Sequence, residues 1–116
     1  MDIYHIWCNL KPGVSDVDFA EQARAYFEHL QTHGKVEGYR ITRAKLGLRP
    51  TELREFHIML EFQGLAQLDS AFTLVSTRAA PVEQVHHAVN SLVTDVLFAL
   101  YRDFPDPGRV HGQERF

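Results

Sequence analysis

The chain has 116 residues, a formal net charge of -3 and 45% hydrophobic residues. This length fits one domain with one core, and the interspersed charges lack the basic surface that nucleic acids require. Since no apolar run approaches the roughly 20 residues that span a bilayer, we expect a single soluble α+β domain with neither a nucleic-acid nor a membrane partner.

The first 34 residues predict a strand followed by a helix. Residues Asp2–Leu10 alternate between two sets of side chains, which is typical of a strand with two different faces. Ser15 and Asp18 resemble a capping box, and Gly34 suits the left-handed residue that ends a helix. One stripe along this helix is apolar and should face a core: Phe19, Ala23, Tyr26, Phe27 and Leu30.

Two more strands follow, joined by a loop that contains Gly47 and Pro50. Val36–Ala44 is the less hydrophobic strand. Glu55–Phe62 places four apolar residues on one face and Glu55, His57, Met59 and Glu61 on the other. This pattern predicts a sheet that helices cover on one face only.

The second half predicts a broken helical region and one last strand. Apolar residues recur at helical spacing after Gly64, and Pro81 at a first helical position restarts the pattern. Val96–Arg102 suits either a continued helix or a buried strand, and we favour the strand. Residues 103–116 predict an extended C-terminal tail because they are rich in proline, glycine and charge.

This order, strand-helix-strand-strand-helix-strand, is that of the ferredoxin-like fold, with a four-stranded antiparallel sheet and both helices on one face. The aromatic first strand, the broken helical region and the tail make residues 2–103 resemble the dimeric α+β barrel superfamily. The resemblance implies that 1–116 is one domain that forms a homodimer by packing two sheets face to face. Some members are cofactor-independent or haem-degrading monooxygenases, and others have no known activity.

The haem-degrading members take an Asn, a Trp and a His from separate elements, whereas Trp7 and Asn9 share one strand here. That catalytic triad is therefore not carried over, and we predict no cofactor.

The uncovered sheet face holds the candidate site. In the expected strand order the first and third strands are antiparallel neighbours, which predicts His5 near Glu61 and Asn9 near His57. An imidazole oriented by a carboxylate suits a general base, and an aromatic wall suits a small hydrophobic or aromatic ligand. We favour ordinary packing of this face in a dimer interface, and a ligand-handling site is the alternative. The complete candidate set is His5, Trp7, Asn9, His57, Met59 and Glu61.

Other histidines and the single cysteine predict no second site. His29 and His33 have the spacing of two metal ligands on a helix, but two ligands alone favour ordinary surface residues, and we predict no metal site. His86 and His87 point about 100° apart on a helix, so they do not share a compact site. Cys8 falls on the apolar strand face and should behave as a small buried hydrophobe.

Together these features predict a homodimeric assembly or small-molecule-binding module. The alternative is a monooxygenase, either cofactor-independent or of the haem-degrading type, that acts on a small aromatic metabolite. A lone cysteine and an N-terminal run without a basic region or cleavage site predict a cytoplasmic location.

Overall fold

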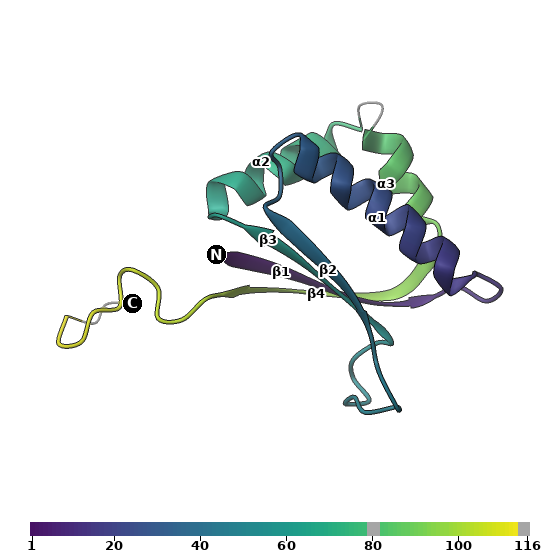
Figure 1. The fold of residues 1–116 in the computed structure, drawn as a ribbon, viewed down its shortest axis with the longest axis horizontal. Coiled ribbons are helices and arrows are strands. Elements are labelled where there is room, and N and C mark those ends of the chain that lie inside the picture. Colours follow the sequence, from purple (N-terminus) through teal and green to yellow (C-terminus); the bar gives the residue numbers. More distant parts are fainter. Residues whose placement is uncertain (79–81, 114–116) are drawn as a thin grey trace.

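Four antiparallel strands form one sheet in the order β2-β3-β1-β4, and three helices lie on one side of it (Figure 1). The computed structural model describes residues 1–78 and 82–113. The elements, in chain order, are β1 Asp2–Leu10, α1 Asp16–Thr32, β2 Gly38–Arg43, β3 Phe56–Phe62, α2 Leu65–Ser76, α3 Val82–Asn90 and β4 Val93–Arg102. The predicted ferredoxin-like α+β fold is confirmed.

Helix α1 begins and ends where the sequence predicts. The Ser15 hydroxyl accepts a hydrogen bond from the Asp18 backbone N–H at 3.3 Å, which satisfies one of the free donors of the first turn. Gly34 has a φ of 68°, a conformation that costs a side-chain-bearing residue energy, so it closes the helix without strain.

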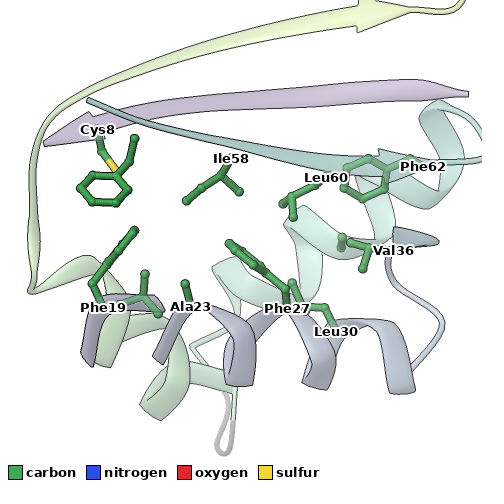
Figure 2. Packing of buried hydrophobic residues seen from close by; sticks show 12 residues of the cluster. Cys8, Phe19, Ala23, Phe27, Leu30, Val36, Ile58, Leu60 and Phe62 are labelled. Carbon is green, nitrogen blue, oxygen red and sulfur yellow. The ribbon is translucent and has the colours of Figure 1, made fainter. Parts of the chain in front are cut away.

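The core lies between α1 and the upper face of the sheet. Figure 2 shows Phe19 and Phe27 of α1 pointing towards Cys8 of β1 and towards Ile58 and Leu60 of β3. Phe19 is fully buried, and its ring meets that of Phe56 edge to face at 5.0 Å between centroids. The predicted apolar stripe is therefore the face that joins the helix to the sheet.

The second half confirms the broken helical region and the last strand. Two separate helices, α2 and α3, replace one long helix, while Pro81 lies outside the described residues. Strand β4 pairs with β1 along most of its length, so Val96–Arg102 is strand and not helix. It starts three residues earlier than expected, and an irregularity near Asp95, whose φ is 56°, shifts its register against Asn9.

The predicted register of β1 against β3 is wrong by two residues. His5 lies opposite Met59, Trp7 lies opposite His57, and Glu61 lies opposite Ile3. A slip of two residues keeps every side chain on its own face, so the alternation of residue types does not distinguish the two registers. No tight turn joins these two strands, and therefore no turn geometry sets the pairing either.

The residues after β4 leave the body of the domain as an irregular tail, as predicted for the described part up to residue 113 (Figure 1). Arg102, at the end of β4, pairs with the buried carboxylate of Asp2 and lies 3.6 Å from that of Asp106. Both ion pairs form within one chain, so they tie the end of the sheet and the start of the tail to β1.

Candidate functional site

The face of the sheet opposite the helices carries all six predicted site residues. Within the described residues no helix covers this face, and the loop of residues 44–55 is the main element on that side (Figure 1). The cross-strand pairs place the β4 side chains of Leu97, Ala99 and Tyr101 beside those of Trp7, His5 and Ile3. We call this surface the open face. Its members on β1 and β3 are Ile3, His5, Trp7, Asn9, His57, Met59 and Glu61.

Two imidazoles meet at the centre of the open face. The His5 Nδ1 atom lies 2.8 Å from the His57 Nε2 atom, and the indole of Trp7 stacks on both rings with centroids 5.6 and 4.5 Å away. Burial lowers the pKa of His5, and burial together with the charge of His5 lowers the pKa of His57. The expected pairing of His5 with the Glu61 carboxylate is therefore replaced by a pair of histidines.

Asn9 and Glu61 lie at opposite ends of the open face. The Asn9 amide nitrogen donates to the Asp95 carboxylate at 3.3 Å, and its oxygen accepts from the Glu55 backbone N–H at 3.0 Å. These bonds link three strands at the irregularity of β4, so Asn9 has a structural part and lies away from His57's imidazole. Glu61 lies opposite Ile3 and Gly38.

A small cavity opens beside one end of the open face, under the loop of residues 44–55. Its volume is about 210 Å³, and Trp7, Thr42 and His57 line it together with Leu53 and Arg54 of the loop. This is less than the roughly 300 Å³ of the smallest usual ligand pockets. In the single chain, the open face therefore offers a surface and a small recess.

A much larger cavity lies on the other side of the sheet, between the strands and the three helices. Its volume is about 860 Å³. The strands contribute mainly apolar side chains, including Ile6, Ile58 and Phe98, while the helices contribute apolar and polar ones together. The roomier of these two cavities is therefore on the helical face, whereas the pocket expected on the uncovered face needs a second copy to enclose it and stays a prediction.

Polar groups gather on the helical wall of this larger cavity. The ring of Tyr26 lies 5.6 Å from that of His86, between centroids. Burial, the nearby negative charge of Glu83 and the presence of Tyr4 raise the pKa of Tyr26 to about 12, and burial raises the pKa of Tyr4. Both hydroxyls therefore keep their protons at neutral pH and can donate hydrogen bonds to a ligand oxygen.

A family model matches residues 1–116, the whole length of the chain, and its description is a family of unknown function, DUF6614. The chain belongs to the DUF6614 family. No protein with a curated functional description matches it.

Solved structures show the same fold as this DUF6614 chain at low sequence identity. A protein from Arabidopsis thaliana, At3g17210, has a TM-score of 0.69 and 12% identity over 91% of this chain and 98% of its own. A dimeric ferredoxin-like protein of unknown function from Jannaschia sp. CCS1 has a TM-score of 0.63 and 13% identity over 89% and 100%. An antibiotic biosynthesis monooxygenase has a TM-score of 0.59 and 14% identity over 90% and 100%.

These similarities establish that the DUF6614 chain has a ferredoxin-like fold that is found in dimeric proteins. Sequence identities this low carry no residue roles from one protein to another. Within residues 1–78 and 82–113, none of the helices has the length and apolarity needed to cross a membrane.

The remaining predicted candidates in the DUF6614 chain form no further site. A ring nitrogen of His33 lies 2.9 Å from the backbone carbonyl oxygen of His29, one turn earlier on the same helix. In the described part of the chain, no three potential ligands group around a possible metal position. Cys8 is 1% exposed and burial raises the pKa of its thiol to about 11, which confirms it as a small buried hydrophobe.

Sequence reasoning missed the tyrosines of the larger cavity. Tyr26 was assigned to the apolar stripe of α1 and Tyr4 to the apolar face of β1. The available signal was that both hydroxyls belong to core-facing positions, where a polar group needs a partner. His86 and His87 of α3 both line this cavity, although His87 is the more exposed of the two.

Proposed function

We propose that this DUF6614 chain is a homodimeric protein that binds a small aromatic ligand in the larger cavity. The observation that carries the proposal is the cavity itself: at about 860 Å³ it lies within the range of small-molecule sites, and its lining is largely apolar with a set of polar groups from the helices. The apolar lining suits the face of a flat ring system. The polar side chains of the helices, such as Tyr26, Ser76 and His86, suit hydroxyl, carbonyl or acidic groups along one edge of the ligand.

The charged groups around the cavity favour a ligand that carries an acidic group. Arg78 and His86 line the same cavity as Tyr26, and Glu83 is the carboxylate among these polar residues. A phenol or a carboxylate beside the Arg78 guanidinium would accept hydrogen bonds, while its ring would contact Ile58 and its neighbours. An aromatic acid or phenol fits this arrangement better than an aliphatic or a cationic molecule.

The open face serves dimerisation in this proposal. It presents Trp7, Met59 and Tyr101 to solvent in the single chain, and Tyr101 is 62% exposed. An uncovered sheet face with aromatic residues at its centre is stabilised when a second sheet packs on it. The ferredoxin-like protein from Jannaschia sp., which has this fold, is dimeric. The six residues predicted as a ligand pocket become interface residues.

Replacing Ser76 by Trp should block the cavity. Ser76 lines the cavity from the end of α2 and is itself exposed, so an indole there would narrow the cavity without entering the core. We expect Ser76→Trp to weaken the binding of anilinonaphthalene sulfonate, an aromatic anion, by at least about tenfold. Fluorescence titration of the folded protein measures this affinity.

Thr77→Trp is the matched control, because Thr77 is the next residue, is also exposed and does not line the cavity. The hydroxyls of Ser76 and Thr77 each donate a hydrogen bond to a backbone carbonyl oxygen three residues earlier, at 2.9 and 2.6 Å. The two substitutions therefore remove equivalent hydrogen bonds. Equal affinity of the wild type and both variants would place the dye elsewhere and refute the cavity as the binding site.

A second candidate function is a cofactor-independent monooxygenase. It is favoured by the adjacent Tyr26 and His86 rings at the cavity and by the shared fold with an antibiotic biosynthesis monooxygenase. In such a reaction His86 would remove the proton of a bound phenol, and the Tyr26 hydroxyl would donate a hydrogen bond to a ligand oxygen.

If this activity exists, Tyr26→Phe should lower the rate of oxygen consumption with hydroxylated naphthalenes by about a hundredfold. The affinity for anilinonaphthalene sulfonate should change little, because the ring that lines the cavity remains. An oxygen electrode measures the rate. If the wild-type protein consumes no oxygen with any of these compounds, binding without catalysis is the function.

A further inference from the structure

The histidine pair on the open face has one hydrogen to share. The His5 Nδ1 and His57 Nε2 atoms are 2.8 Å apart, which is a hydrogen-bond distance, so one nitrogen donates and the other accepts. Trp7 stacks on both rings, and the edge of Tyr101 meets His5 at 5.0 Å between centroids. The pair is therefore held between aromatic walls on two strands, β1 and β4.

Acid changes this arrangement in two stages. A first added proton leaves a charged imidazolium that still donates to its neutral neighbour, but a second places hydrogens on both facing nitrogens and ends the bond. An imidazolium also carries a hydrogen on its other nitrogen. The Nε2 atom of His5 is buried and has no hydrogen-bond partner among the described residues, so a charge on His5 has no acceptor at that end.

The groups around the pair do little to stabilise a positive charge. On β1 and β3 the facing neighbours are Trp7 and Met59, on β2 Thr42 lies opposite His57, and on β4 Ala99 lies opposite His5. Five charged or titratable groups from the surrounding elements face the histidine pair. They are Arg40 of β2, Arg54 of the loop, Glu55 just before β3, Glu61 in β3 and Tyr101 of β4. None of the carboxylates makes a hydrogen bond to either imidazole in the described structure.

A second copy on the open face would remove the water that remains near the pair. In a two-fold symmetric interface the same patch of both copies forms the contact, so each copy buries its own histidine pair. The free-energy cost of burying a charge therefore arises twice in each dimer. The face of Trp7 attracts such a charge weakly, whereas Met59, Leu97 and Ala99 offer it neither a hydrogen-bond acceptor nor a negative charge. Burial already lowers the pKa of both histidines in the single chain, and further burial acts in the same direction.

We propose that the open face binds a second copy of this chain only while the His5–His57 pair is uncharged, so that acidification separates the homodimer. This inference rests on the homodimer proposed above. Its sign follows from the histidines: a group whose pKa is lower in the dimer than in the single chain favours the dimer above its single-chain pKa. That preference is lost as the pH falls below the single-chain pKa, which burial already holds below the ordinary value of 6.5. The switch therefore operates between neutral and mildly acidic pH.

Sedimentation equilibrium from about pH 8 to about pH 5.5 at constant ionic strength tests the proposal. We expect the dimer dissociation constant of the wild type to rise at least about tenfold over this range, since each unit of differential pKa is a tenfold effect. The double variant His5→Gln/His57→Gln keeps polar, uncharged side chains that do not titrate. Its dissociation constant should be the same across the range.

His33→Gln is the matched control, because it removes an exposed histidine of α1 and should keep the full pH dependence of the wild type. Circular dichroism at each pH verifies that every variant is folded. A wild type that is monomeric at about pH 8 overturns the homodimer itself. A wild-type dimer whose dissociation constant does not change with pH overturns the proton dependence alone. A double variant whose dissociation constant still changes with pH as that of the wild type does overturns it as well.

A direct titration does not depend on any histidine variant folding. NMR signals of the His5 and His57 rings report their pKa values in dilute and in concentrated protein. We expect both values to be lower in the concentrated, dimeric sample. Equal values in the two samples would overturn the link between proton binding and assembly.

Discussion

Met59→Arg should convert the homodimer to monomers at concentrations where the wild-type chain remains paired. Met59 lies directly opposite His5, and its half-buried side chain belongs to the open face. In a single chain an arginine there extends into water. In the dimer it would be a buried charge without a partner, at a cost of about 3–5 kcal/mol, which corresponds to at least about a hundredfold rise in the dissociation constant.

Sedimentation velocity at micromolar concentration measures this change. Gln22→Arg is the control, because it introduces the same charge at an exposed position of α1, and it should leave the dimer intact. The thermal unfolding of the Met59→Arg monomer should remain cooperative. A Met59→Arg protein that sediments as a tight dimer would show that the open face is not the interface.

Phe19→Ala should destabilise the domain more than any substitution on the open face. The Phe19 side chain is fully buried between α1 and the sheet, where it contacts Phe56 and forms part of the cavity wall. Truncation removes buried apolar area and enlarges an existing void, which costs about 3–5 kcal/mol of unfolding free energy. Domains of this size have about 5–15 kcal/mol in total, so the loss is a large fraction.

Urea denaturation followed by circular dichroism measures the unfolding free energy. Val17→Ala on the same helix is the control, because Val17 is 60% exposed and its truncation should cost less than about 0.5 kcal/mol. If both variants unfold at the same urea concentration, Phe19 is not the centre of the core that the structure places there.

Periodicity in the sequence predicted the elements and the face on which each side chain lies. The alternation in β1 and β3 and the stripe of α1 respond to burial, and burial is what fixes these positions in the fold. The capping residue Ser15 and the left-handed Gly34 mark the ends of α1 for local reasons that depend on few neighbours. These are the features that a single sequence contains.

The candidate site required information that periodicity lacks. The partner of His5 depends on the strand register, and the two registers differ by a slip that preserves both faces. The cavity depends on how far α2 and α3 stand from the sheet, a distance that the spacing of apolar residues does not encode. For these reasons His57 replaced Glu61 beside His5, and Tyr26 was taken for an ordinary core residue.

Strand β1 carries the two proposed activities at alternate residues. Its odd-numbered side chains, such as His5 and Trp7, lie on the open face, where we propose that the second copy binds, and its even-numbered side chains, such as Tyr4 and Ile6, line the larger cavity. The two sets point away from each other through the thickness of one backbone. Substitutions at neighbouring positions of β1 can therefore change dimerisation without changing ligand choice, or ligand choice without changing dimerisation, in evolution and in protein design.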